Sequence, residues 1–271
     1  MSRPKALLIG EIELAQPSWD ALSSLAELVT YTAHDRTAFI SDCRSGLYDG
    51  VVAICDRAPS SQAVTGKWDE ELLSALPSSL RFICHMGAGY DSIDVHAFTR
   101  RGIHVSNVPR VVEDATADTA IFLILAALRG FNNGILAIRN GTWKGKVPPP
   151  PLGLMPQGKT LGILGMGGIG QNLKRKAEVF GMYVGFDELL TRSDVLSLNL
   201  PLNDKTRNII STKEFEKMKH DVVIVNTARG GVLDEEALVK ALDSDRVRAP
   251  GVGRQSACLL IAAYGYIYSR G

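Results

Sequence analysis

Three glycines stand at G-x-G-x-x-G spacing near the middle of the chain, at Gly165, Gly167 and Gly170. The apolar run Thr160–Leu164 before them is typical of a buried strand, and residues 171–180 after them have a helical pattern. In this order the first glycine permits a tight turn, the second lets the backbone approach a pyrophosphate, and the third lets the helix pack on the strand. Free amides at the helix start favour phosphate. The stretch therefore predicts a dinucleotide-binding turn.

A second candidate is Arg229, within the sequence Asn-Thr-Ala-Arg-Gly-Gly that follows the apolar run 222–225. In open parallel sheets, ligands bind outside the carboxyl ends of the strands. A guanidinium group placed there can hold a carboxylate by two parallel hydrogen bonds. An ordinary surface arginine in a glycine-rich turn is the alternative interpretation.

Two further turns follow apolar runs. In Leu-Asn-Leu-Pro-Leu at 198–202, with Thr206 shortly after, Pro201 would stop the strand and turn the chain where a nicotinamide or ribose would lie. Taken alone, the segment is better explained as a plain strand end. Met-Gly-Ala-Gly-Tyr-Asp at 86–91 could expose backbone amides to an anion, although a simple tight turn explains it equally well. His85 directly precedes this second turn. It could face a cleft, but we favour a structural imidazole whose hydrogen bonds are satisfied.

Composition excludes several classes of protein. The 271 residues fit one or two domains, and 45% hydrophobic residues supply a core. With 30 basic and 29 acidic residues, there is no electrostatic argument for nucleic acid or membrane binding. The four cysteines have no metal-ligand spacing, so we expect no metal site and free, buried thiols. The apolar runs are too short for a signal peptide or a membrane span, and a cytoplasmic protein is expected.

The first hundred residues alternate strand and helix patterns, which predicts a parallel sheet covered on both faces. Strands are expected at 6–9, 28–32, 50–55, 81–85 and 104–108, and helices at 18–26, 37–45, 70–75 and 94–101. A long apolar helix at 115–130 is expected to lie between two domains. An irregular arm at 132–157 contains four consecutive prolines. A second α/β unit has expected strands at 160–164, 194–200 and 222–226, and helices at 171–180, 212–218 and 234–242.

Together these motifs resemble the D-isomer-specific 2-hydroxyacid dehydrogenases, particularly the glyoxylate/hydroxypyruvate reductase branch. The resemblance covers roughly residues 4–248 and is most specific at Val-Asn-Thr-Ala-Arg-Gly-Gly-Val-Leu-Asp-Glu-Glu-Ala-Leu. It implies an α/β fold of two doubly wound parallel-sheet domains: a flavodoxin-like substrate domain at 1–114 and an incomplete Rossmann domain at 158–248. Residues 115–157 would be the interdomain helix and arm, and 249–271 a tail foreign to the family.

The resemblance also implies a reaction, hydride transfer between NAD(P)H and a small 2-oxo acid, and a homodimer. Arg229 would grip the substrate carboxylate and polarise its carbonyl, and the amides of Ala88 and Gly89 would contact the same substrate. The implied cofactor-binding residues are Gly165, Gly167, Gly168, Ile169, Gly170, Pro201, Thr206, Thr227 and Ala228.

Two departures from the family pattern bear on activity. The family's general acid is a histidine, oriented by an acidic residue, downstream of the arginine; none of the five histidines here follows Arg229. Residues 249–271 resemble nothing expected there, and an altered reading frame or an unspliced segment is our hypothesis for them. Since a general acid is typically worth about 10²–10⁴ in rate, we expect little or no reductase activity. A non-catalytic dinucleotide-binding or partner-binding scaffold is the alternative.

The second departure concerns the choice between NAD and NADP. Asp187 follows Gly170 by 17 residues, a spacing that suits a carboxylate on an NAD ribose. We favour another interpretation, in which Phe-Asp-Glu-Leu-Leu at 186–190 is the family's next helix. The second strand and the loop after it would then be deleted between Met182 and Tyr183, and cofactor preference stays open.

Overall fold

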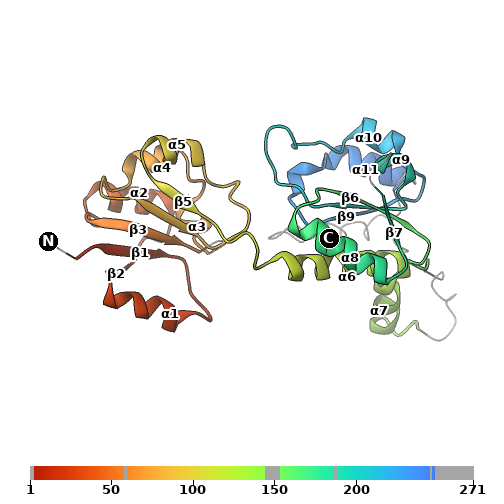
Figure 1. Cartoon of the computed structure of the whole chain (residues 1–271), viewed down its shortest axis with the longest axis horizontal. Helices are drawn as coiled ribbons and strands as arrows, with labels where there is room; N and C mark the ends of the chain where they lie inside the picture. Colours follow the sequence, from red (N-terminus) through yellow and green to blue (C-terminus); the bar gives the residue numbers. More distant parts are fainter. Residues whose placement is uncertain (1–2, 58–59, 144–152, 186–187, 245, 248–271) are drawn as a thin grey trace. The chain divides into compact units, whose positions relative to one another are not determined.

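The computed structural model describes residues 3–57, 60–143, 153–185, 188–244 and 246–247. The chain divides into two compact units, Met1–Val111 and Val112–Gly271 (Figure 1). The division lies three residues before the expected boundary at 114. Asp187, the prolines at 148–151 and the tail at 249–271 fall outside the described residues. Each unit is described below by itself.

The first unit is a five-stranded parallel sheet in the order β2-β1-β3-β4-β5, which is the flavodoxin-like order (Figure 1). Its strands lie where the alternating pattern predicts them, at β1 Lys5–Ile9, β2 Glu27–Thr30, β3 Val51–Asp56, β4 Phe82–His85 and β5 His104–Ser106. The helices are α1 Gln16–Ala21, α2 Arg36–Arg44, α3 Gln62–Thr65, α4 Glu70–Ala75 and α5 Val95–Arg100, with a 3-10 turn at Leu22–Ser24. The short helix α3 is absent from the sequence prediction.

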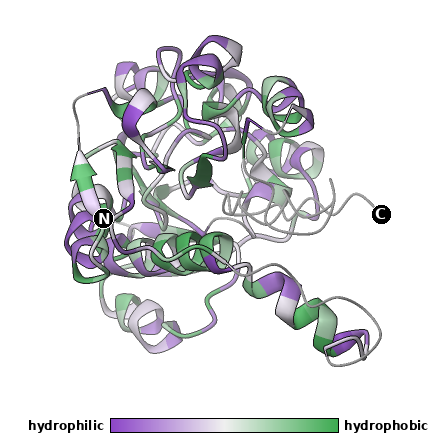
Figure 2. Cartoon of the chain, turned by 90° about the vertical axis from the view of Figure 1, so that its right-hand side faces the viewer, coloured by the Kyte–Doolittle hydropathy of each residue, from purple (hydrophilic) through white to green (hydrophobic). Residues whose placement is uncertain are grey.

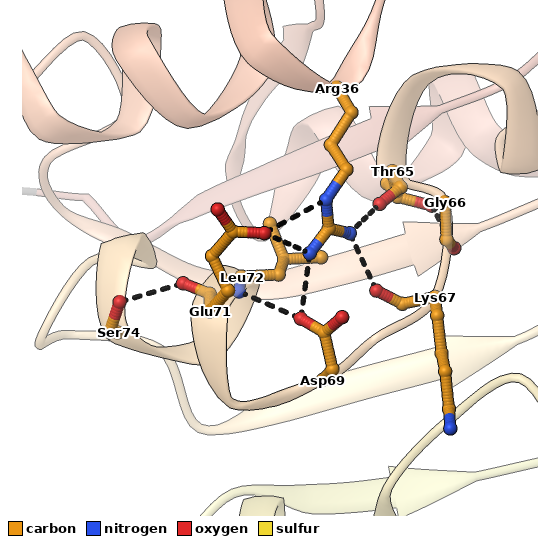
Figure 3. Close-up of polar contacts among 8 residues, drawn as sticks. All are labelled: Arg36, Thr65, Gly66, Lys67, Asp69, Glu71, Leu72 and Ser74. Atoms are coloured by element: carbon orange, nitrogen blue, oxygen red, sulfur yellow. Dashed lines mark hydrogen bonds and ion pairs between the residues drawn. The ribbon is translucent and has the colours of Figure 1, made fainter.

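A single arginine ties two helices of this unit together. Arg36, the first residue of α2, pairs with Asp69 at 2.7 Å and with Glu71 at 2.9 Å (Figure 3). Its Nη1 donates to the carbonyl of Lys67 at 2.6 Å and to that of Thr65. Asp69 is also the N-cap of α4. The planar guanidinium therefore joins the starts of α2 and α4 through bonds that a lysine could not reproduce.

Strand alternation in this unit corrects the cysteine prediction. The three described cysteines are free, as expected, and Cys43 is buried. Cys55 is only half-buried and Cys84 is exposed. Along β4 the side chains alternate, so Ile83 and His85 point into the core while Cys84 points to the opposite, open face.

The second unit is a four-stranded parallel sheet in the order β7-β6-β8-β9 (Figure 1). Its strands are β6 Thr160–Leu164, β7 Tyr183–Gly185, β8 Val195–Leu198 and β9 Val223–Asn226. Its helices are α6 Glu113–Arg129, α7 Phe131–Arg139, α8 Gly168–Val179, α9 Leu189–Arg192, α10 Thr212–Lys217 and α11 Glu235–Asp243, with a 3-10 turn at Gly230–Val232. Alternate residues of β8 and β9 enter two separate apolar clusters, one against α6 and α8, the other against α10 and α11. The sheet is thus covered on both faces, although it has fewer described strands than a complete Rossmann sheet.

Two elements depart from the sequence prediction. The predicted arm begins instead as helix α7, because Gly130 in the left-handed conformation ends α6 and a new helix starts at once. Helix α6 belongs to the second unit, where its buried side chains pack with those of α8. Among the described helices, none alone could span a bilayer by length and hydropathy; α6 and α7 would do so only as a pair bent by 72°.

The position beside β6 is filled by the three residues of β7. Tyr183, Val184 and Gly185 pair with Thr160, Leu161 and Gly162. A strand therefore lies where the deletion interpretation expects one to be lost. It is short, and it is followed almost at once by α9.

Candidate active site

The predicted glycine turn connects β6 to α8 with the geometry of a phosphate-binding turn. Gly165 has a φ of +106°, which side chains rarely adopt, and a Cβ there would lie 2.8 Å from the Asn199 backbone. A Cβ on Gly170 would collide with the carbonyl oxygen of Gly165. By contrast, a Cβ on Gly167 would meet no described atom within 4 Å. The outer glycines serve close packing, and the middle one leaves the approach to α8 open.

The start of α8 suits the pyrophosphate of a dinucleotide. Gly167 is the N-cap, no described side chain caps it, and the first turn holds no acidic residue. The first-turn amides of a 12-residue helix are therefore available to an anion. One neighbour opposes this: the carboxylate of Glu113, at the start of α6, lies against the α-carbon of Gly168. The start of α8 therefore fits the pyrophosphate of NAD or NADP, although the Glu113 carboxylate places a negative charge beside it.

Hydrogen bonds connect the carboxyl ends of the neighbouring strands β6, β8 and β9 at this turn. The amide of Asn199, after β8, donates to the carbonyl of Leu164 at 2.8 Å. The hydroxyl of Thr227, after β9, donates to the Asn199 side-chain oxygen at 3.0 Å. The glycine turn and the arginine turn therefore lie on the same edge of one sheet.

The turn that carries Arg229 is shaped by a buried asparagine. Asn226, 0% exposed, accepts from the Ala228 amide and donates to the Arg229 carbonyl, each at 2.9 Å. Such side-chain-to-backbone bonds fix a turn without help from a strand partner. The half-buried Arg229 donates from Nη1 to the Ala228 carbonyl at 2.9 Å. The guanidinium is thus carried on a rigid backbone.

Pro201 and Thr206 form the neighbouring loop of the same unit. The Thr206 hydroxyl donates to the Pro201 carbonyl at 2.7 Å and accepts from the Asn203 amide at 2.8 Å. The Asn208 amide donates to the carbonyl of Gly231, which joins this loop to the arginine turn. The structure therefore brings together the predicted residues from Gly165 to Arg229. Thr206 closes its own loop with its hydroxyl, a structural role that the sequence did not indicate.

Ala88 and Gly89 belong to the first unit, in the loop that follows β4. Beneath them lies His85, the one buried histidine of five, all of which the structure describes. His85 Nδ1 lies 2.5 Å from Asp56 Oδ2, and Nε2 lies 2.9 Å from the Gly89 carbonyl oxygen. The bond to the Asp56 carboxylate raises the pKa of His85, although burial opposes it. The expectation of a satisfied structural imidazole is confirmed.

Known proteins are similar to this chain in sequence. Residues 121–186 and 182–252 match the family model for the NAD-binding domain of D-isomer-specific 2-hydroxyacid dehydrogenases. A 4-methyl-2-oxopentanoate reductase A of Aspergillus oryzae is 50% identical over 92% of this chain and 80% of its own length. Glyoxylate reductase 1 of Saccharomyces cerevisiae is 40% identical over 92% and 78%. The chain belongs to the D-isomer-specific 2-hydroxyacid dehydrogenase family.

The fold comparison agrees with this membership. A crystal structure of a glyoxylate reductase from Paecilomyes thermophila matches with a TM-score of 0.85 and 52% identity, over 91% of this chain and 80% of that one. As a D-2-hydroxyacid dehydrogenase, the chain is an oxidoreductase whose cofactor is NAD or NADP and whose substrates are small 2-oxo or 2-hydroxy acids.

The family match is split, and its two segments overlap at 182–186. The split falls at the point of the proposed deletion, between Met182 and Tyr183.

Several residues of this dehydrogenase site were not singled out from the sequence. Asn199 and Asn226 each end an apolar strand, a position where asparagine often bonds a turn, so that signal was present. Asp56 and Glu113 gave no such signal. Each meets its neighbour only after distant strands or helices have packed together.

Proposed function

We propose that this chain binds NAD(P)H at the Gly165–Gly170 turn and a glyoxylate- or hydroxypyruvate-type 2-oxo acid at Arg229, and that it transfers hydride slowly. This proposal rests on the hydrogen bonds that connect the carboxyl ends of β6, β8 and β9, because they place the glycine turn and the arginine turn on one edge of the sheet. Bound NAD(P)H would supply the hydride.

Arg229 performs two tasks in this proposal. Its fork binds the substrate carboxylate by two parallel bonds, and its charge polarises the adjacent carbonyl. The family resemblance assigns the amides of Ala88 and Gly89, in the first unit, to binding of the 2-oxo acid. Pro201, Thr227 and Ala228 line the nicotinamide side. The reduced oxygen then requires a proton, and the 271 residues contain no histidine after Arg229 to deliver it.

The first test compares binding with turnover. NADH and NADPH binding is measured by protein fluorescence, and turnover with glyoxylate and hydroxypyruvate by nicotinamide absorbance. We expect binding of at least one nucleotide, and turnover about 10²–10⁴ below that of the yeast glyoxylate reductase. Turnover at the yeast enzyme's rate contradicts the proposed slow transfer. Absence of nucleotide binding contradicts the site itself.

An Arg229→Lys variant tests whether Arg229 binds the carboxylate of the substrate. Lysine keeps the charge and loses the fork, so we expect weaker oxalate binding with unchanged NADH binding. Equal oxalate affinity in the variant and the parent contradicts the role of Arg229.

A non-catalytic scaffold that binds a dinucleotide or a partner protein is the second candidate, favoured by the lack of a histidine after Arg229. It predicts nucleotide binding with no measurable turnover at any pH. Slow but saturable turnover that disappears in Arg229→Lys favours the enzyme instead.

We also propose a cytoplasmic homodimer. The exposed side chains Phe131, Ile135 and Ile138 recur at helical spacing along α7. Figures 1 and 2 show α7 projecting from the body of its unit, with hydrophobic and hydrophilic residues both present. A second copy is the occupant that the family resemblance implies for this face. A light-scattering measurement that shows only monomer contradicts the homodimer. Cell fractionation that places the protein outside the cytoplasm contradicts the cytoplasmic location.

A further inference from the structure

The loop at 87–91 has three consecutive carbonyls, and each accepts a hydrogen bond. The Val108 amide donates to Gly87 at 3.0 Å, the Asn107 side-chain amide to Ala88 at 2.8 Å, and His85 Nε2 to Gly89 at 2.9 Å. In a trans peptide the N–H points opposite to the carbonyl. The amides of Ala88, Gly89 and Tyr90 are therefore turned away from these donors. No backbone carbonyl among the described residues accepts a bond from those three amides.

His85 is the only one of the three donors that carries a titratable group. Its Nε2 faces a carbonyl oxygen, which can only accept, so Nε2 carries a proton. The second proton lies between Nδ1 and Asp56 Oδ2, 2.5 Å apart. Both side chains are nearly inaccessible, at 2% and 1%. Asp56 Oδ1 is buried without a hydrogen-bond partner among the described residues, so the carboxylate depends on His85 for compensation.

We propose that the buried His85–Asp56 pair is a positioning device for the substrate carboxylate: it holds the Gly89 carbonyl inward so that the amides of Ala88, Gly89 and Tyr90 face the acid. This inference rests on the proposed function, which places a 2-oxo acid on that loop. His85 touches no substrate in this account and acts only through the loop.

Gly87 shows how closely the loop rests on the ring. A Cβ added at Gly87 would lie 2.7 Å from His85 Nε2 and 3.2 Å from Cδ2. The imidazole is fixed on its other side by Asp56. Glycine is therefore required at this point if the ring is to reach the Gly89 carbonyl.

The first measurement uses the unaltered chain. Long-range ¹H–¹⁵N spectra at pH 7 are expected to show His85 with protons on both ring nitrogens. A spectrum in which Nε2 carries no proton overturns the inference, because the Gly89 carbonyl would then have no donor. This measurement needs no ligand and no variant.

The second measurement uses oxalate as an unreactive probe, with no nucleotide present. In the parent chain, oxalate is expected to shift the amide resonances of Ala88, Gly89 and Tyr90. In His85→Leu the dissociation constant is expected to rise about tenfold, the effect of one lost hydrogen bond. His85→Gln, whose amide can still donate to the Gly89 carbonyl, should recover part of the affinity. His34→Leu is the matched control, since the His34 side chain is 85% exposed.

The outcomes separate the two claims. If oxalate shifts none of the three amides in the parent chain, the proposed function of the loop fails, and the positioning role fails with it. If oxalate shifts them equally, with equal affinity, in the parent chain and in His85→Leu, only the positioning role fails. If His85→Leu does not fold, the comparison of His85→Gln with the parent decides, and unequal binding is the expected result.

Discussion

The two units support their ligand-facing turns in different ways. In the first unit, the loop at 87–91 rests on the charged, buried pair His85–Asp56. In the second unit, the turn that carries Arg229 is held by the neutral side chains of Asn226, Thr227 and Asn199. The difference has a physical basis. The charge of Asp56 lies beneath its loop and is matched by His85, whereas the side chains that hold the arginine turn carry no charge. A charged pair supports one turn, and hydrogen bonds between neutral groups support the other.

The largest effect is expected from removing the charged support. His85→Leu leaves the Asp56 carboxylate buried and unpaired, which should cost about 3–5 kcal/mol in the free energy of unfolding. Urea denaturation measures this loss. The double variant His85→Leu/Asp56→Leu should be more stable than His85→Leu alone, because no uncompensated charge is left. If the double variant is no more stable than His85→Leu, the stability lost in His85→Leu comes from packing and not from the unpaired charge.

A pH change should weaken the same pair by less. The pKa of His85 is raised, mainly by the Asp56 carboxylate, with Asp91 of the loop contributing. The stability from the pair is therefore fully present below about pH 6.5, the value for an unfolded histidine, and is lost as the pH rises through the raised pKa. Urea denaturation of the parent chain should give lower stability at pH 9 than at pH 6.5. In His85→Leu this part of the difference should vanish, and a difference of the same size would contradict the assignment.

Removing the neutral support should cost less again. Asn226→Ala leaves the Ala228 amide without its acceptor and removes one of the hydrogen bonds to the Arg229 carbonyl, which still accepts from the Val232 amide; the expected loss is about 1–3 kcal/mol. Oxalate binding should weaken as well, because the backbone that carries Arg229 is released. Asn140→Ala, at an exposed site, is the control. Asn226→Asp sharpens the comparison, since it introduces a negative charge into the hydrogen bonds that hold this turn, and oxalate binding should weaken further.

The smallest effect is expected at Glu113. Its carboxylate lies against Gly168 at the start of α8, where it opposes a pyrophosphate. Glu113→Gln should therefore tighten NADH binding about two- to fivefold, in the range for a charge at a helix terminus. Fluorescence titration measures the change, and Glu27→Gln on exposed β2 is the control. Unchanged or weaker NADH binding in Glu113→Gln would show that the carboxylate does not act on the nucleotide.

Much of the fold was predictable, because local patterns determine it. The strand Thr160–Leu164 and the helix Glu70–Ala75 were predicted to the residue. Helix α7 was missed, since Asn-Asn-Gly at 132–134 suggests a loop. The site was predictable where a motif carries it, as in the glycine turn and the arginine turn. Whether the predicted residues act as assigned stays a prediction.

What the sequence could not reveal are contacts set by sheet register. Asp56 and His85 lie 29 residues apart. They meet because β3 pairs with β4 in a register that aligns those two residues. Neither strand alone indicates that register, and so the pair was invisible until the sheet was known.

The tight fit between Gly87 and the ring of His85 links two positions of the chain in evolution. A side chain at 87 would displace the imidazole, and a smaller residue at 85 would leave room for that side chain. Substitutions at these two sites should therefore occur together among related reductases: histidine at 85 accompanied by glycine at 87, and larger residues at 87 found only where the ring is absent.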